Sequence, residues 1–229
     1  VSKRLNDNWR IGVYAGESFN KPSLGNITYD PTKSPSYGGF VAWNQSPNGL
    51  GYGIQVSAIT GQGTYHIGTD KTNVNANAYQ IKGTYARALD PTTLFTDYVG
   101  IRQSNFKVNG WTESGPVFPL TYSGIEQNAT DLIVGGGVAK QLNDKVTVNA
   151  NLGIVHNLSN SVSAVNTTSE MGKFSAPLNA SRYTAASVGA GLSYEVAKNQ
   201  RIGVNVGWQQ RNLTNTNITS YGLSYTIGF

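Results

Sequence analysis

Few residues in this chain could do acid–base or metal chemistry. Its 229 residues include two histidines, His66 and His156, and no cysteine. Asp70 follows His66 by four residues, and such a pair could activate a water molecule as a general base. Two polar residues this close are more often ordinary surface groups, so we expect no catalytic residue. A thiolate site is excluded and no carboxylates cluster beside the histidines, so we expect neither a metal ion nor a cofactor.

The composition excludes several classes of protein. Charged residues make up 13% of the chain, well below the roughly 25% typical of soluble domains, and the hydrophobic fraction is only 38%. The net charge of +5 comes from scattered basic residues, so we expect no nucleic-acid binding. No apolar run approaches the roughly 18 residues that a membrane-spanning helix needs. The composition favours a β-barrel with a lipid-facing exterior and a lumen lined by small polar residues.

The last eleven residues show the clearest strand pattern. Tyr221, Leu223, Tyr225, Ile227 and Phe229 share one face, and Ser, Thr and Gly occupy the other. A period of two indicates a strand with one apolar side, and about ten residues is the length a tilted strand needs to cross a bilayer. Residues 146–154, 186–194 and 201–209 repeat the design. A soluble sheet would carry Lys and Glu on its polar face, whereas Gly, Ser, Thr and Asn here favour a lumen.

Six earlier strands and the lengths of the connections complete the predicted topology. The strands are expected at Trp9–Glu17, Tyr37–Asn44, Gly51–Thr64, Asn75–Ala88, Leu94–Lys107 and Ala129–Leu142, which makes ten in all. Short turns are expected at Gln45–Gly49, Leu89–Thr93, Asn143–Lys145 and Ala197–Gln200. Longer connections are expected at Ser18–Ser36, Gly61–Val74, Val108–Asn128, Leu158–Ser181 and Asn212–Asn217.

This alternation of short and long connections is typical of outer-membrane barrels, which have short periplasmic turns and longer outer loops. We therefore predict an all-β, antiparallel, up-and-down transmembrane β-barrel that forms one domain over residues 1–229. It would lie in a bacterial outer membrane with both termini in the periplasm.

Position along the strands assigns charged and aromatic residues to opposite faces. A charge facing lipid at mid-depth costs about 2–4 kcal/mol, so inward charges are expected in the lumen. They are Arg10, Lys82, Arg102, Asp131, Glu195 and Arg211. Because both signs are present they could brace the wall in pairs, or they could line a pore and grip a threaded segment. Outward aromatics suit the bilayer interface, and the expected girdle is Trp9, Tyr37, Trp43, Tyr52, Tyr79, Tyr85, Phe95 and Trp208, with Tyr221 and Phe229 at the end of the chain.

Four motifs carry a resemblance to a known family. Gly100-Ile101-Arg102 is followed by Gly110-Trp111-Thr112-Glu113 and by a glycine-rich strand over 132–138, and the chain closes on Tyr225-Thr226-Ile227-Gly228-Phe229. Over about residues 76–229 the sequence resembles the translocator domain of classical (type V) autotransporters. Barrels of that family have twelve strands preceded by a helix in the pore. Ten strands and no helix before Trp9 are found here, so either two strands and the helix lie outside this sequence or the barrel is a related ten-stranded type.

The resemblance implies a function and a set of partners. The barrel would anchor in the outer membrane and let a covalently linked N-terminal passenger reach the cell surface through its pore, without catalysing a reaction. Lipids and lipopolysaccharide of the outer membrane would surround it. The barrel-assembly machinery would recognise the terminal strand through Tyr221, Leu223, Tyr225, Ile227 and Phe229. The alternative is a stand-alone small channel or surface adhesin that acts through outer loops rich in Asn, Thr and Ser.

Overall fold

The main element of the fold is a long path of antiparallel strands. A computed structural model describes residues 2–17, 23–24, 27–30, 35–67, 69–115, 118–198, 200–210 and 217–227. Neighbours in the path follow the order β1 (Ser2–Arg4), β2 (Trp9–Glu17), β5 (Pro35–Asn44), β6 (Gly51–Ile67), β7 (Asp70–Asp90), β8 (Thr93–Val108), β11 (Ile125–Gln141), β12 (Val146–Val162), β15 (Thr184–Ala197), β16 (Gln200–Gln209) and β17 (Ile218–Ile227). Every pairing along this path is antiparallel.

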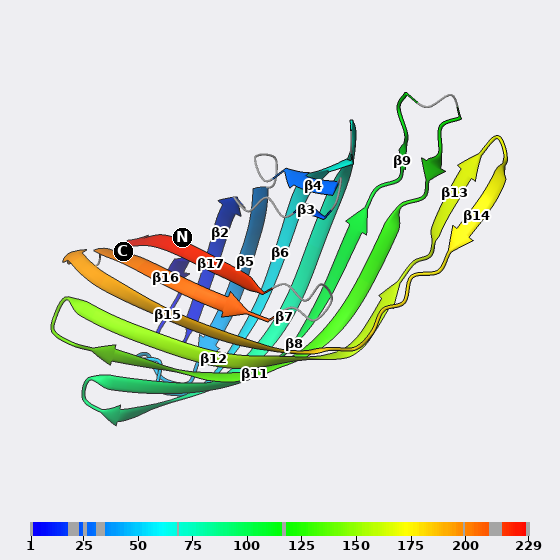
Figure 1. Cartoon of the computed structure of the whole chain (residues 1–229). Helices are drawn as coiled ribbons and strands as arrows, with labels where there is room; N and C mark the ends of the chain where they lie inside the picture. Colours follow the sequence, from blue (N-terminus) through cyan, green and yellow to red (C-terminus); the bar gives the residue numbers. More distant parts are fainter. Residues whose placement is uncertain are drawn as a thin grey trace.

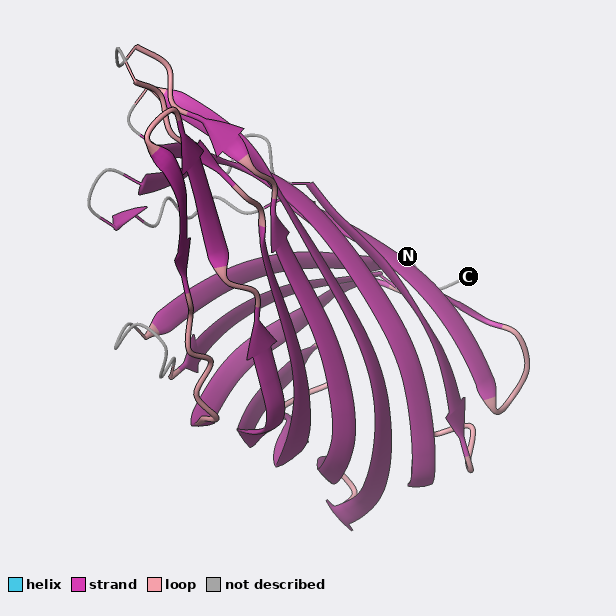
Figure 2. Cartoon of the chain, turned by 90° about the vertical axis from the view of Figure 1, so that its right-hand side faces the viewer, coloured by secondary structure: helices cyan, strands magenta, loops and turns pink. Residues whose placement is uncertain are grey.

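The sheet is curled like the wall of a barrel, and β15 to β17 swing round from the plane of β6 and β7 (Figures 1 and 2). Among the described residues the path ends at β1 and at β17, and no register joins these two strands. The described wall is therefore a half-barrel, and the predicted all-β, up-and-down, antiparallel class is confirmed. No helix in the described part of the chain is long and apolar enough to cross a membrane.

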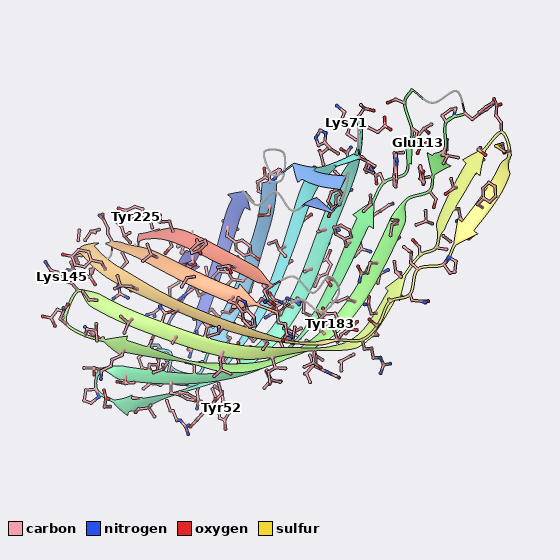
Figure 3. All side chains as sticks on the ribbon, viewed as in Figure 1. Tyr52, Lys71, Glu113, Lys145, Tyr183 and Tyr225 are labelled. Carbon is pink, nitrogen blue, oxygen red and sulfur yellow. The ribbon has the colours of Figure 1, made fainter. Side chains whose placement is uncertain are left out.

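The ten predicted strands are confirmed, since each corresponds to one strand from β2 to β17 of the path. The additional strand, β1, is three residues long and too short to show an alternation in the sequence. The predicted short turns lie together at one end of the wall. Asn143 stabilises one of them, because its Oδ1 accepts hydrogen bonds of 2.9 Å from Lys145 N and Val146 N. Lys145 and Tyr52 lie at this end, and Lys71 and Glu113 lie at the other (Figure 3).

The prediction of a loop over Gly61–Val74 is wrong. β6 and β7 continue as a hairpin through this region, with paired residues from Gln62 and Asn75 up to Ile67 and Asp70. The outward apolar row of β6 stops after Ala58, so the outward alternation that marks a strand is lost in this region. The backbone pairing continues past that point because Thr, Tyr, Ile and Val, which favour strands, alternate here with polar residues. The hairpin therefore extends well beyond the length needed to cross a bilayer.

Three of the other predicted long loops also contain strands. A second small sheet has the order β14 (Gly172–Ala176), β13 (Val165–Ser169), β10 (Thr121–Tyr122) and β9 (Trp111–Thr112). It projects beyond the ends of β8, β11 and β12, opposite the short turns (Figure 1). The segment Ser18–Ser36 contains β3 (Ser23–Leu24) and β4 (Ile27–Asp30), and β4 pairs with β6. Long connections are thus gathered at one end, as predicted, but they are partly folded.

The two faces of the wall differ in residue type and in burial. On β6, Tyr52, Ile54 and Val56 are exposed on one face, which we call the outer face. Gly53, Gln55 and Ser57 lie on the other face, which we call the inner face. By register, the buried residues Ala86, Asp131, Val155 and Ala185 all lie on the inner face. A curled sheet crowds side chains on its concave side, so the inner face is the concave one.

Candidate functional site

The most buried polar side chains of the described chain gather on the inner face around Asp131. This carboxylate is 1% exposed and lies directly opposite Arg102 of β8. The Arg102 guanidinium donates to Asp131 Oδ2 from Nη2 at 2.9 Å and from Nε at 3.3 Å. A buried charge needs such a partner, because desolvation of an unpaired ion costs several kcal/mol.

Two further side chains donate hydrogen bonds to Oδ1, the second carboxylate oxygen of Asp131. Asn157 Nδ2 donates to Asp131 Oδ1 at 2.8 Å, and the Tyr183 hydroxyl donates to the same oxygen at 3.2 Å. The Asn157 side chain is 0% exposed, and its backbone N–H donates to the Tyr183 carbonyl at 2.8 Å. Figure 3 shows Tyr183 close to the ends of β12 and β15, remote from the short turns. We call Arg102, Asp131, Asn157 and Tyr183 the Asp131 network.

A local irregularity in the pairing of β11 with β12 positions the Asp131 network. The β11–β12 register shifts between Thr130 and Asp131, which is a β-bulge. A bulge adds one residue to a strand and re-aims the side chain beside it. The Asp131 network therefore ties β8, β11 and β12 to the segment that leads into β15. Asn157 Oδ1 has no hydrogen-bond partner among the described atoms.

The other charged residues expected in the lumen also lie on the inner face where the structure describes them. Lys82 Nζ lies 5.6 Å from the centre of the Tyr98 ring, a cation–π distance. Glu195 pairs with Arg201 at 3.4 Å, in a more exposed setting than the Asp131 network. Arg10 lies opposite Ala42 on one side and Arg4 on the other. Arg211 and most of the predicted loop Asn212–Asn217 lie outside the described residues.

Tyr98 packs over glycines on the inner face. Its hydroxyl donates to the Leu152 carbonyl at 3.4 Å. Gly135 and Gly153 lie beneath it, and a Cβ added at Gly153 would be 2.6 Å from the hydroxyl. A Cβ at Gly135 would meet both the hydroxyl and the Leu152 carbonyl oxygen. These two glycines therefore leave the space that the tyrosine ring occupies.

Sequence reasoning missed several residues of these clusters. Asn157 and Tyr183 lie beyond the predicted strand ends, and Arg201 and Tyr98 were not singled out. Arg201 could have been found from its position opposite Glu195 across a short turn. Asn157 shares the inward parity of residues 147–153, so a longer strand would have placed it on the inner face. Nothing in the sequence pattern indicates Tyr183.

The predicted girdle residues lie on the outer face, and several neighbour one another near the short turns. Trp9 is opposite Trp43, and the rings of Tyr52 and Tyr85 are 4.9 Å apart. Phe95 lies under the Arg87 guanidinium at 5.1 Å. The other predicted members lie further along the wall: Tyr37 opposite Ala15, Tyr79 opposite Ala58 and Trp208 opposite Val188.

The described part of the predicted assembly signal forms an exposed row on β17. Tyr221 and Leu223 are each 82% exposed, and Tyr225 is 57% exposed. They lie opposite Val206, Val204 and Ile202 of β16, so both strands present apolar side chains on the outer face. Phe229 and the side chain of Ile227 lie outside the described residues.

The Gly110-Trp111-Thr112-Glu113 motif folds back on β10 in the second sheet. The Trp111 and Tyr122 rings stack at 4.6 Å with an interplanar angle of 13°. Glu113 accepts hydrogen bonds from the Tyr122 hydroxyl at 2.9 Å and from Leu120 N at 3.2 Å. Burial, and then the hydrogen bond to the Glu113 carboxylate, raise the pKa of Tyr122 above its ordinary value.

Asp70 and His66, the possible acid–base pair, lie at the tip of the β6–β7 hairpin, where Asp70 makes structural contacts. Asp70 accepts hydrogen bonds from Ser114 N at 3.1 Å and from the Ser114 hydroxyl, and so ties the β9 segment to the hairpin. His66 lies opposite Lys71 in the register. His156 is on the outer face, with Nδ1 2.8 Å from the Thr184 hydroxyl. In the described part of the chain no three His, Asp or Glu side chains cluster as metal ligands would.

Comparison with known proteins identifies the family. A family model described as the autotransporter beta-domain matches residues 1–207. No curated protein matches the sequence. The structure is similar to the translocator domain of autotransporter NalP from Neisseria meningitidis, with 15% identity, a TM-score of 0.72, and coverage of 100% of this chain and 77% of that one. It is also similar to the outer membrane protease OmpT from Escherichia coli, with 13% identity, a TM-score of 0.51, and coverage of 96% and 93%.

At these identities the two structural likenesses show the fold alone. The family match, in contrast, spans most of the sequence and agrees with the resemblance carried by Gly100-Ile101-Arg102 and Gly110-Trp111-Thr112-Glu113. The chain belongs to the autotransporter β-domain family and is an outer-membrane translocator domain.

Proposed function

We propose that residues 1–229 act as one domain that anchors a covalently linked passenger in the outer membrane and lets it pass to the cell surface along the inner face. The observation that carries this proposal is the contrast between the two faces. Aliphatic side chains such as Val56 and Ile81 cover the outer face, while the inner face holds Gln55, Lys82 and the Asp131 network. Such a wall is stable only with lipid outside and a polar space inside.

The charged residues of the inner face divide into two roles in this proposal. Arg102 with Asp131, and Glu195 with Arg201, pair across neighbouring strands and brace the wall. Arg10 and Lys82 have no carboxylate within 4 Å among the described residues, so their charges are available to a segment in the lumen. We propose that these two cations contact the passing polypeptide, with Arg211 as a further lumen residue.

The domain itself catalyses no reaction in this proposal. The Asp70 carboxylate, which could have polarised His66, is held by Ser114. The chemistry of the passenger is a separate matter from that of the wall. The likeness to an outer membrane protease has 13% identity and concerns the fold.

The proposed orientation places the short turns and both ends of the chain in the periplasm, and the second sheet outside the cell. The aromatic girdle would then contact the two bilayer interfaces, with Trp9, Trp43, Tyr52, Tyr85 and Phe95 towards the periplasm. Tyr79 and Trp208 lie further along the wall. The barrel-assembly machinery would recognise the outer row of β17, namely Tyr221, Leu223, Tyr225, Ile227 and Phe229.

Secretion of the passenger tests this function directly. The full-length protein is expressed in a Gram-negative host, and the passenger is detected on intact cells by antibody binding and protease cleavage. Arg10→Glu with Lys82→Glu should lower surface passenger several-fold at an unchanged level of barrel in the outer membrane. Glu195→Gln is the control and should leave secretion unchanged. A wild-type protein that inserts into the outer membrane but keeps its passenger in the periplasm would contradict the proposal.

A further inference from the structure

One carboxylate of β8 lies on the outer face, among aromatic and aliphatic side chains. Asp97 is directly opposite Tyr85 of β7, and its side chain is exposed. Tyr85 belongs to the outer face, since its ring lies 4.9 Å from that of Tyr52. Along β8 the neighbours of Asp97 on this face are Phe95, towards the short turn, and Val99, which is 52% exposed. An acidic group therefore interrupts the apolar outer face.

The depth of Asp97 sets this carboxylate apart from charges at the ends of the wall. Asp97 is further from the short turns than Phe95, by about 6.6 Å along the strand. Phe95 belongs to the aromatic girdle in the proposed orientation, and Val99 and Ile101 continue into the aliphatic part of the face. The carboxylate thus lies on the lipid side of the girdle. An ionisable group inside the membrane is costly there unless a group of opposite charge meets it.

The described part of the wall does not supply that opposite charge. Asp97 forms no ion pair and accepts no hydrogen bond among the described residues. Arg87 is the outward cation one row away, but its guanidinium lies 5.1 Å from the centre of the Phe95 ring instead. Glu126, on the outer face near the opposite end, differs because it accepts two hydrogen bonds from asparagine side chains. The Asp97 carboxylate is therefore available to another molecule.

The surface beside Asp97 leaves the carboxylate uncovered. Gly136 of β11 is directly opposite Asp97 on the outer face, and a Cβ added there would be 3.3 Å from Asp97 Oδ1. Gly83 of β7 is opposite Val99, and a Cβ added there would meet nothing closer than 3.9 Å. Small residues let membrane-embedded segments approach one another closely, as helices do. A second wall could therefore reach the Asp97 carboxylate.

Arg87 and Asp97 together form a self-complementary pair of charges. They lie on neighbouring strands, one outer row apart, because Arg87 is opposite Phe95 and Asp97 is opposite Tyr85. Copies inserted in one membrane share their orientation, so a two-fold axis along the membrane normal brings the same patch of both copies together at one height. With strands tilted by about 40°, one row corresponds to about 5 Å in height, which an arginine side chain can span. Arg87 of each copy can then meet Asp97 of the other.

We propose that the outer face of β7, β8 and β11 is a contact between two copies of this chain, in which Asp97 of each copy pairs with Arg87 of the other. The inference goes beyond the proposed function and rests on one part of it, namely that the outer face meets lipid. Two ion pairs form by symmetry, and each removes a carboxylate from contact with lipid. The passengers of the two barrels would then leave the membrane side by side.

Co-purification of two tagged forms of the full-length protein tests this contact. The two forms carry different affinity tags, are expressed together and are extracted in a mild detergent, and the share of one form that co-purifies with the other is measured. Asp97→Arg in both forms should lower this share about tenfold, and Arg87→Asp in both forms should do the same, because like charges then meet at both contacts. Asp97→Asn keeps the size of the side chain and should also lower the share, so it tests the contact even where a reversed charge impairs insertion.

The mixture of the two charge variants is the sharpest arm of this experiment. Asp97→Arg in one form and Arg87→Asp in the other place opposite charges at both contacts, so co-purification should return to the wild-type level. A contact within one wall cannot give this recovery. Lys140→Asp and Glu126→Arg reverse charges elsewhere on the outer face and should co-purify as wild type does. Equal co-purification of wild type and Asp97→Asn, or no recovery in the mixed pair, overturns the inference.

Display of the passenger on intact cells separates this inference from the proposed function. Wild-type copies that display their passenger but do not co-purify would overturn the contact between copies and leave the proposed function standing. A wild-type protein that fails to insert into the outer membrane would overturn both.

Discussion

The Arg102 guanidinium and the Asp131 carboxylate face each other across β8 and β11, with Nη2 and Oδ2 2.9 Å apart and the Asp131 side chain 1% exposed. Glu195 and Arg201 form the other ion pair found on the described inner face, at 3.4 Å and with the Arg201 side chain 58% exposed. The two pairs differ in burial, and this difference governs what each contributes to the stability of the wall.

Asp131→Ala should lower the free energy of unfolding by about 3–5 kcal/mol, because it leaves a partly buried Arg102 without its counter-ion. Glu195→Ala is the matched control, and its exposed partner limits the loss to about 1 kcal/mol or less. Urea unfolding of the full-length protein in lipid vesicles measures both. Equal losses for the two variants would show that the Asp131 network does not brace the wall.

Substitution of the glycines under Tyr98 should cost stability in a defined order. Gly135→Ala places a Cβ against the Leu152 carbonyl, which cannot move away, whereas Gly153→Ala mainly meets the Tyr98 hydroxyl at 2.6 Å. Overpacking of this kind costs about 1–3 kcal/mol, with Gly135→Ala the larger. Tyr98→Phe should relieve most of the Gly153→Ala defect and little of the Gly135→Ala defect. A double-mutant cycle with no coupling between Tyr98 and Gly153 would refute this packing.

The fold could be predicted from the sequence where one face of a strand meets lipid along its whole length. Residues 219–227 and the three strands before them show the alternation directly, because every second side chain is apolar. The β6–β7 hairpin tip could not be predicted this way, since the apolar row moves to the inner face above Asn77. An alternation search for outward apolar residues therefore stops where the wall leaves the acyl region.

The candidate site was predictable only in part. Parity along the strands placed Arg102 and Asp131 on the inner face, but their direct contact depends on the β8–β11 register, which no local pattern sets. The bulge beside Asp131 and the contribution of Tyr183 depend on long-range pairing. Whether each inward charge braces the wall or faces the lumen could not be predicted from the sequence. Only distances separate Arg102, which pairs with a carboxylate, from Lys82, which has no carboxylate within 4 Å among the described residues.

The Tyr122 hydroxyl should titrate above the usual tyrosine pKa of about 10. Its pKa is raised in the folded protein by burial and by Glu113, so the stabilisation is present below pH 10 and is lost as the pH rises through the raised value. The pH titration of ultraviolet absorbance is measured for wild type and for Tyr122→Phe, and the difference between the two curves reports the ionisation of Tyr122. Glu113→Gln should shift the difference curve to lower pH, and an unshifted curve would rule out the hydrogen bond.

Asp70→Asn should loosen the β9 segment without unfolding the wall, because the carboxylate that receives the Ser114 N–H and hydroxyl loses its charge. Limited proteolysis should then cut within residues 109–124 several times faster than in wild type. Asp144→Asn changes a carboxylate at the opposite end and serves as the control. Unchanged cleavage in Asp70→Asn would show that this contact does not order the segment.

Removal of Phe229 should reduce insertion of the protein in cells and leave refolding of the purified protein into vesicles largely unchanged. The first process needs recognition of the terminal strand, whereas the second needs only that the wall form. Leu223→Ser, within the exposed row of β17, should act in the same direction. Equal losses in cells and in vesicles would mean that the row acts in wall formation alone.

In the proposed wall, alternate residues of one strand face lipid and a polar interior, and adjacent positions on β6 test this arrangement. The sequence has no cysteine, so Val56→Cys and Ser57→Cys each give a single labelling site. With a fluorophore at either site of residues 1–229 folded in vesicles, quenchers on the acyl chains should quench the label at 56 and spare the label at 57. A water-soluble quencher should give the reverse. Identical quenching at both positions, or acyl-chain quenching at 57 alone, would contradict the account.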